Sequence, residues 1–457
     1  MYTSFIKSFV ILAGGMLMSW NTVSAQQKNR QLDDYITSAF AQNLGLKQQN
    51  FDLERSMFAL KEAKAMYMPT VSLLGSYTKA AGGRTIDVPV GDLVNPIYTA
   101  LNQLTSSNKY PQLPNQSFLL NPDNFYDVKM RTSLPLINAE IRYNSLIKKQ
   151  LISSQQAAVN VYKRALVKDV KTAYYQYYQA MQGVEAYKSA MILIDENIRV
   201  NTSLLKNGVR NGTALLRAQT EQQKTSSALI NAQKNVENAR AYFNFLLNRS
   251  LTDSIHTEGL AIADVSLVPD TTGGSGNREE LKQLHFMKEV NNLDYKLQRS
   301  NIIPKLSTFI DLGSQGTAFQ VNDKTRYYLW GVNLQWDIFT GGKNKFRAAQ
   351  AQSNIRSAEA KIEETEKAFQ LQLTQSYNNY RSAQAACSSA TAGLSFAGKY
   401  YRDQLKAYHA GQLLYLELID AQDQLTSARL RMADAQAALQ IALAELERNQ
   451  ASYPLSN

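Results

Sequence analysis

Two stretches of the chain alternate apolar and polar residues with a period of two. Between residues 126 and 134 the even-numbered positions are mainly apolar, whereas the odd-numbered ones, such as Asp127 and Arg131, are polar or charged. Between residues 327 and 338 the even-numbered positions, which include Trp330 and Trp336, are again apolar. This period predicts strands with one apolar face, at about 125–137 and 326–339.

Each of these strands has a predicted partner just before it along the chain. The segments "PTVSLLGSYT" and "PKLSTFIDLG" predict strands at about 69–79 and 304–315. Each begins at a proline, Pro69 or Pro304, which a strand tolerates as its first residue.

Two stretches free of proline, 139–250 and 343–448, carry a helical pattern rich in Ala, Gln, Ser and Asn. A helix over residues 139–207 would be roughly 100 Å long at the usual rise per residue. Periodic patterns of this length are typical of coiled coils. Each stretch breaks once at a glycine, Gly208 or Gly411, and a left-handed glycine there would end one helix and let the next turn back. The sequence therefore predicts two helical hairpins.

The two hairpins are related in sequence. A shift of 203 residues, from Gly208 to Gly411, also aligns Gln219 with Gln422. Such self-similarity indicates an internal duplication. The first repeat then spans residues 26–250 and the second 279–448. A linker at 251–278, containing "TTGGSG", joins them, and residues 449–457 form a C-terminal tail.

The N-terminus has the pattern of a secretory signal peptide over residues 1–25. Lys7 precedes the apolar run "SFVILAGGMLMSW", which is too short to span a bilayer, and "VSA" ends at Ala25 as a small-residue cleavage site. The alternative is a buried N-terminal helix. The pattern places the mature chain beyond the inner membrane.

Residues 80–125 hold five of the ten prolines together with many asparagines. Proline and asparagine punctuate regular structure, so this stretch predicts a long surface loop.

Charge and chemistry exclude several function classes. The net charge of +11 comes from Lys and Arg scattered among acids along the helices, without the compact basic patch that nucleic acid requires. The three histidines and Cys387 form no metal-ligand spacing or nucleophile motif. The run "TGGKN" lacks the earlier glycine and the Ser or Thr of a phosphate-binding loop. We therefore expect no enzyme, no nucleic-acid partner, no cofactor and no metal.

Alternation over about ten residues, with aromatics near the ends, is the pattern of a transmembrane β-barrel strand. It predicts that Trp330 and Trp336 face lipid while Asn333 and Gln335 face a lumen. The alternative is a soluble sheet with one face on a core. Four strands cannot close a barrel, which needs about eight, and open edges cannot lie in lipid. The membrane interpretation thus requires several copies of the chain.

The order of strand pair, helical hairpin, strand pair and helical hairpin resembles the TolC family of outer-membrane efflux ducts. The resemblance covers nearly the whole mature chain. It is carried by the strand-to-helix junction "WDIFTGGKNKFRAAQAQ", by its degraded counterpart "LPLINAEIRYNSLIKKQ", and by "FAQNLGLKQQNFDLERSMFALKEAKAMYMPTVSL", which is similar to the family's first helix and strand.

The resemblance implies a homotrimer of mixed α and β structure. Four strands per chain, twelve per trimer, would form a membrane β-barrel that continues into a long periplasmic α-helical coiled-coil barrel. Such a duct lies in the outer membrane, contacts its lipid, and docks with a periplasmic adaptor protein and an inner-membrane transporter. It passively conducts drugs or other substrates of an efflux or type I secretion system to the exterior.

The resemblance also assigns roles to single residues. Gly208, Gly411 and Tyr408 would belong to the periplasmic tip turns, and Gly341 and Gly342 would form the strand-to-helix junction. The acidic tip after Gly411 carries Glu417 and Asp420, which match the family's pore-constricting carboxylates. Leu413 stands where family members can carry an arginine. The alternative is that these carboxylates pair with basic residues of an adjacent helix.

Two other classes of protein fit less of the sequence. A soluble periplasmic coiled-coil scaffold would leave the alternating segments unexplained. A porin made only of β-barrel would leave most of the chain, the helices, unexplained.

Overall fold

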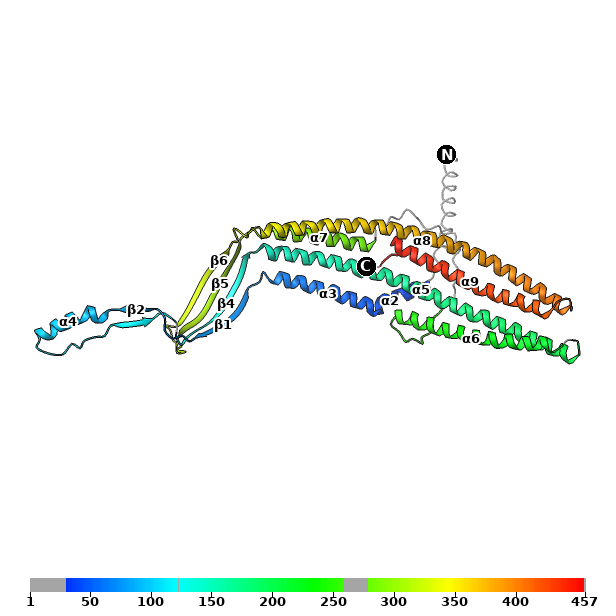
Figure 1. Cartoon of the computed structure of the whole chain (residues 1–457), viewed down its shortest axis with the longest axis horizontal. Helices are drawn as coiled ribbons and strands as arrows, with labels where there is room; N and C mark the ends of the chain where they lie inside the picture. Colours follow the sequence, from blue (N-terminus) through cyan, green and yellow to red (C-terminus); the bar gives the residue numbers. More distant parts are fainter. Residues whose placement is uncertain (1–29, 122, 210, 258–277, 456–457) are drawn as a thin grey trace, which may run out of the picture. The chain divides into compact units, whose positions relative to one another are not determined.

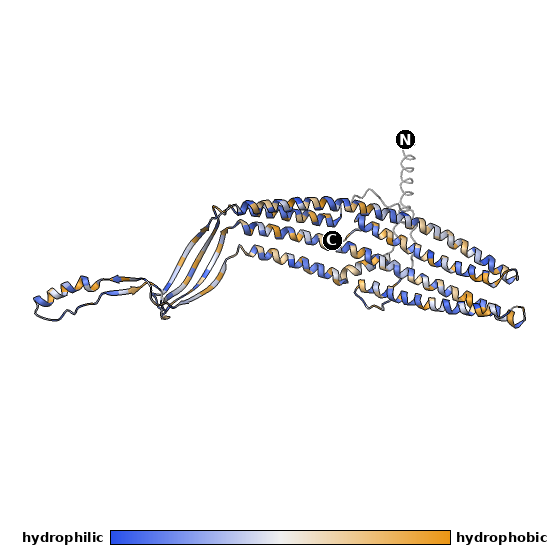
Figure 2. Ribbon diagram, in the orientation of Figure 1, coloured by the Kyte–Doolittle hydropathy of each residue, from blue (hydrophilic) through white to orange (hydrophobic). Residues whose placement is uncertain are grey.

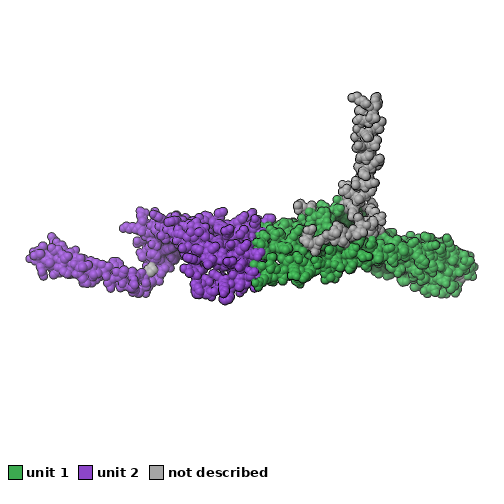
Figure 3. All heavy atoms as spheres, turned by 90° about the horizontal axis from the view of Figure 1, so that it is seen from above, with its two compact units in different colours: residues 1–56, 150–290, 355–457 green, residues 57–149, 291–354 purple. Residues whose placement is uncertain are grey.

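The computed structural model describes residues 30–121, 123–209, 211–257 and 278–455, and Figure 1 shows the course of the chain. The predicted signal peptide, residues 1–25, lies outside the described residues, as does most of the predicted linker. Within the described part, contacts divide the chain into two compact units (Figure 3). One unit takes the described parts of residues 1–56, 150–290 and 355–457, and the other takes 57–149 and 291–354.

The element order repeats once along the chain, in line with the predicted duplication. The first half contains α2 (Arg30–Gln42), α3 (Leu44–Ala65), β1 (Thr70–Thr78), β2 (Thr85–Val88), α4 (Val90–Leu104), β3 (Gln116–Leu119), β4 (Phe125–Ile137), α5 (Ala139–Lys206) and α6 (Thr213–Leu246). The second half contains α7 (Glu279–Ser300), β5 (Lys305–Thr317), β6 (Arg326–Gln335), α8 (Lys343–His409) and α9 (Tyr415–Gln450). The mixed α and β fold class is confirmed.

Four strands form one antiparallel sheet in the order β1-β4-β5-β6. The register pairs Met130 of β4 with Leu73 of β1 and with Leu312 of β5. On the other side of β5, Ile310 pairs with Trp330 of β6. Within the described chain, β1 and β6 are edge strands, each paired on one side only.

β6 is shorter than the predicted strand. It ends at Gln335 rather than near residue 339, because the chain turns tightly there: the Ile338 N–H donates to the Trp336 carbonyl over 3.1 Å. An i to i+2 bond of this kind replaces the ladder bond to a neighbouring strand. Trp336 therefore lies just past the strand, where its Nε1 donates to the Ile302 carbonyl over 3.0 Å.

The predicted surface loop at 80–125 is wrong in one respect, since this insert contains regular structure. β2 and β3 pair antiparallel, with Ile86 opposite Phe118, and α4 lies between them in sequence. Pro89 precedes α4 and Pro96 lies inside it. The prolines indicated irregular backbone, but side-chain bonds from asparagines hold the helix in place, as described below.

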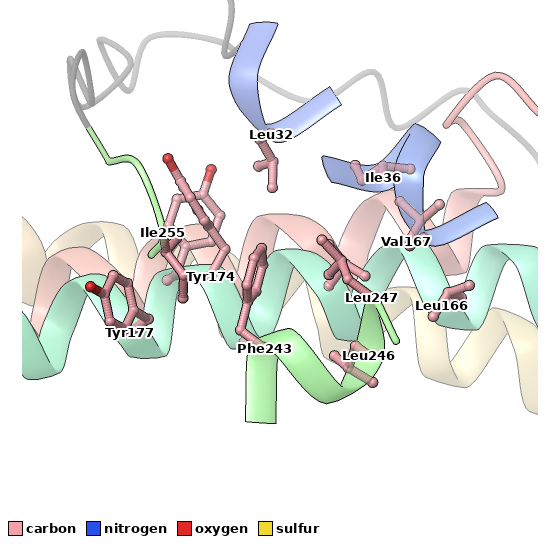
Figure 4. Packing of buried hydrophobic residues seen from close by; sticks show 14 of the residues in the cluster. Leu32, Ile36, Leu166, Val167, Tyr174, Tyr177, Phe243, Leu246, Leu247 and Ile255 are labelled. Carbon is pink, nitrogen blue, oxygen red and sulfur yellow. The ribbon is translucent and has the colours of Figure 1, made fainter. Parts of the chain in front are cut away.

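The helices of the first unit pack around small clusters of buried side chains. The largest cluster joins α2, α5 and α6, and Figure 4 shows Tyr174, Phe243 and Ile36 within it. Tyr35 and Phe243 meet edge to face, with ring centroids 5.1 Å apart. Such aromatic pairs add to the free energy of burial. Further along the bundle, Cys387 of α8 packs with Leu439 and Leu446 of α9.

Candidate functional site

The four-stranded sheet exposes an apolar face. Alternate positions of neighbouring strands lie side by side on it, as the register requires, and Figure 2 shows the alternating hydropathy along the strands. Leu73 is 77 % exposed and Trp330 66 % exposed. The exposed apolar side chains of this face are Val71, Leu73, Val128, Met130, Ile310, Leu312, Tyr328, Trp330, Val332 and Leu334. A contiguous apolar surface of this kind marks a contact with lipid or protein.

The opposite face of the sheet carries a network of ion pairs. Arg131 donates two bonds of 2.7 Å to the carboxylate of Asp311, whose side chain is 1 % exposed. Lys129 pairs with Asp127 at 2.6 Å, and the Tyr327 hydroxyl donates to Asp127 over 2.9 Å. The two positive and two negative charges of this network cancel, and Lys305 on the same face of β5 pairs with Glu140 of α5 at 2.6 Å.

The period of two along 126–134 predicted one face for Asp127, Lys129 and Arg131 but gave no indication of Asp311. The sequence could have indicated Asp311, because it is an odd-numbered position like Lys305 and Ser307 and therefore lies on the same face of β5. What the sequence could not show is the register that sets Asp311 directly opposite Arg131.

The two strand-to-helix junctions use different residues. Before α8, Gly341 and Gly342 both have positive φ, 61° and 80°. Successive left-handed residues suit glycine, because other side chains are strained there. Before α5, Asn138 takes this place, and its Oδ1 accepts the Glu140 N–H over 3.0 Å as a helix cap.

Both hairpin turns have the same backbone geometry. Gly208 and Gly411 have φ of 66° and 73°. The Gly208 N–H donates to Leu205 over 3.0 Å and the next N–H to Leu204 over 2.9 Å; the bonds at Gly411 follow the same pattern. This is the Schellman arrangement, which satisfies the last carbonyls of a helix. The sequence-based position of each turn thus agrees with the structure.

Tyr408 is buried near the second turn and links two hairpins of the chain. Its side chain is 3 % exposed, and its hydroxyl donates to Asn201 Oδ1 of α5 over 2.8 Å. About one turn away along α5, Asn197 donates to Gln422 of α9 over 2.9 Å. These buried amides were not predicted from the sequence, although Gln422 is one of the positions that align between the two repeats.

The acidic residues after Gly411 divide into two environments. Glu417 and Asp420 are exposed, and in the described part of the chain neither forms an ion pair; Asp420 accepts a bond from Gln424 over 2.7 Å. Asp423 is half-buried against α6. Burial and the nearby Glu221 carboxylate raise its pKa above the ordinary value. Exposure therefore separates Glu417 and Asp420 from the half-buried Asp423.

Among the described residues, no group of His, Cys, Asp or Glu is arranged to hold a metal ion. None of the described helices combines the length and apolarity needed to cross a bilayer.

Comparison with known proteins supports the predicted resemblance. Residues 275–449 match the outer membrane efflux protein family. The solved outer-membrane channel OprN has 17 % sequence identity and a TM-score of 0.72, with 92 % of this chain and 89 % of that one covered. The outer membrane protein VceC from Vibrio cholerae has 12 % identity and a TM-score of 0.69, covering 92 % and 96 %. The CmeC outer membrane channel of Campylobacter jejuni has 14 % identity and a TM-score of 0.70, covering 92 % and 85 %.

No protein of curated function matches the sequence. The likeness to solved channels establishes the fold across nearly the whole chain, and the family match covers the second repeat. The resemblance to TolC-like proteins is thereby confirmed. The matched family is described as outer membrane efflux proteins, and OprN and CmeC as outer-membrane channels.

Proposed function

We propose that three copies of this chain assemble into an outer-membrane exit duct. Each copy contributes its four-stranded sheet to a single barrel of twelve strands, and its long helices to a periplasmic tunnel. The duct conducts drugs or other substrates of an efflux or type I secretion system passively. It receives them from a periplasmic adaptor protein and an inner-membrane transporter.

The observation that carries this proposal is the pair of open edges on the sheet. β1 and β6 each have one side without a strand partner in the described chain, while the apolar face between them is exposed. In lipid, unsatisfied backbone groups cost several kcal/mol each, so an open sheet is not stable there. Pairing of β6 in one copy with β1 in the next satisfies both edges and closes the sheet.

The two faces of the sheet then have distinct roles. The apolar face, with Trp330 and the nearby Trp336, contacts lipid, and Trp is typical of membrane interfaces. The ion-paired face lines the lumen. Because the charges of Arg131, Asp311, Lys129 and Asp127 cancel within each copy, this part of the lumen discriminates little by cargo charge.

Charge selection is instead assigned to the tip. Glu417 and Asp420 are exposed and have no ion pair in the described chain. Three copies would place six carboxylates around one axis, and rings of carboxylates favour cations. Gly411 and Tyr408 hold the turn that presents them, and the tip region is where the adaptor protein docks.

The proposal is tested by the mass of the complete mature chain purified from outer membranes in detergent. A stable trimer is expected. A monodisperse monomer would refute the architecture, because a single copy leaves both sheet edges open. Recovery of the chain in the soluble periplasmic fraction would instead support a coiled-coil scaffold.

A further inference from the structure

The insert between β1 and β4 contains a helix, α4, with an exposed apolar side, which is the reverse of the usual arrangement in a soluble protein. At 3.6 residues per turn, Leu93, Ile97 and Leu104 fall on one side of α4, and Asn95 and Asn102 fall on the opposite side. The three apolar residues are 68 %, 58 % and 83 % exposed. The polar side of α4 packs against the rest of the insert, and the half-buried Tyr98 lies against Tyr110 with ring centroids 5.5 Å apart. The side with Leu93, Ile97 and Leu104 remains exposed.

Asparagine side chains hold this polar side in place. Asn95 donates to the Leu113 carbonyl over 2.9 Å and accepts the Leu113 N–H over 2.7 Å. Asn102 makes the same pair of bonds with Tyr110, at 2.8 and 3.1 Å. These four bonds fix the returning segment on one side of α4, so the apolar side cannot simply turn inward.

The insert has no apolar core of its own. From residue 79 to 124, leaving aside residue 122, which the structure does not describe, Gly91 alone is buried. The exposed apolar side chains of the insert are Ile86, Val88, Leu93, Ile97, Leu104, Phe118, Leu119 and Leu120. A two-stranded ribbon is marginally stable by itself, and an apolar patch of this kind indicates an interaction surface.

The charge of the insert indicates what covers this surface. Residues 79–124 contain three basic residues (Lys79, Arg84, Lys109) and three acidic ones (Asp87, Asp92, Asp123), so the net charge is zero. Identical copies of a neutral surface can meet without like-charge repulsion. An anionic lipid headgroup layer would instead require an excess of Lys and Arg.

Tethering favours the same occupant. In the trimer of the proposed function, on which this inference rests, three inserts leave one barrel from equivalent strand ends, Thr78 and Phe125. Attachment to a common assembly gives an effective concentration of the order of mM for short connections. Apolar contacts too weak to join free chains would then be sufficient.

We propose that the apolar side of α4 binds the α4 helices of the other two copies, so that the three inserts form one cluster at the outer end of the barrel. Leu93, Ile97 and Leu104 form the contact. The asparagines on the opposite side of each helix keep the apolar side turned toward the neighbouring copies.

The test uses cysteine cross-linking in the full-length trimer. Leu104→Cys and the adjacent Gln103→Cys differ by one residue but lie on different sides of α4, and both positions are exposed. Native Cys387 is buried and present in both variants. With a short bismaleimide, Leu104→Cys should shift from monomer to cross-linked dimer and trimer bands on denaturing gels, whereas Gln103→Cys should remain mainly monomeric. Adding Ile97→Asp to Leu104→Cys should abolish that shift.

The outcomes separate this inference from the proposed function, because the mass of each variant is measured before cross-linking. A trimer in which Leu104→Cys stays uncross-linked and reacts with a bulky maleimide would overturn the cluster and leave the duct intact. Protection of this cysteine from the maleimide in cells, but not in the purified trimer, would also overturn the cluster, because that result indicates a different partner. A monomeric protein would overturn the duct and the cluster together.

Discussion

The substitution Val332→Arg tests the assignment of the apolar face to lipid. Val332 lies on β6 beside Thr308 of β5, and its side chain is 51 % exposed. It stands one and a half residues from the middle of the ten-residue strand Arg326–Gln335, roughly 5 Å along the strand. With the usual strand tilt this is about 4 Å from the midplane, well inside an apolar band about 25 Å tall.

The expected cost follows from this position. An arginine near the bilayer midplane of a barrel costs about 2–4 kcal/mol, which lowers an assembly equilibrium by a factor of about 30 to 900 per copy. A trimer carries three such changes. Asn333→Arg is the matched control, because the neighbouring residue lies on the opposite face, where water is expected.

The assay compares the amounts of folded trimer in outer membranes for the two variants at equal expression. Val332→Arg should deplete the trimer strongly, and Asn333→Arg should leave most of it. Equal depletion would contradict the face assignment. Equal tolerance would indicate that the sheet is not in lipid at all.

Three further predictions address the lumen and the tip. Arg131→Met removes both hydrogen-bond donors from the carboxylate of Asp311 and should lower the stability of the barrel in denaturant titration, because the carboxylate loses its counter-charge. Adding Asp311→Leu should restore part of the loss. No recovery would mean that the pair is not the cause. Glu417→Ala with Asp420→Ala should abolish the block of conductance by divalent or trivalent cations in single-channel recordings and weaken cation selectivity. The yield of trimer should be unchanged. Lost assembly with an intact block would indicate that these acids pair with a neighbouring helix. Because the pKa of Asp423 is raised on folding, its charge opposes folding as pH rises above the ordinary carboxyl range. Asp423→Asn should therefore raise the melting temperature at pH 7 and leave it nearly unchanged in acid. An equal rise at both pH values would exclude titration as the cause.

Local patterns were sufficient for the four strands of the sheet and for the two helical hairpins. The period of two located the strands because a sheet with two different faces imposes that period on its sequence. Gly208 and Gly411 marked the turns because a left-handed helix end strongly favours glycine. The insert was harder to predict, since Asn95 and Asn102 act on backbone groups 8 to 18 residues away, and composition alone does not reveal such bonds.

The sequence by itself determined the order of the four sheet strands and the two helical hairpins, the alternation along the strands and the positions of the tip turns, because each depends on residues close together along the chain. Tertiary structure alone decided which distant groups meet. It set Asp311 against Arg131 across 180 residues and Tyr408 against Asn201 across 207, and it separated Asp423 from the exposed Glu417. These pairings depend on strand register and helix packing, which many residues fix jointly and no short motif encodes.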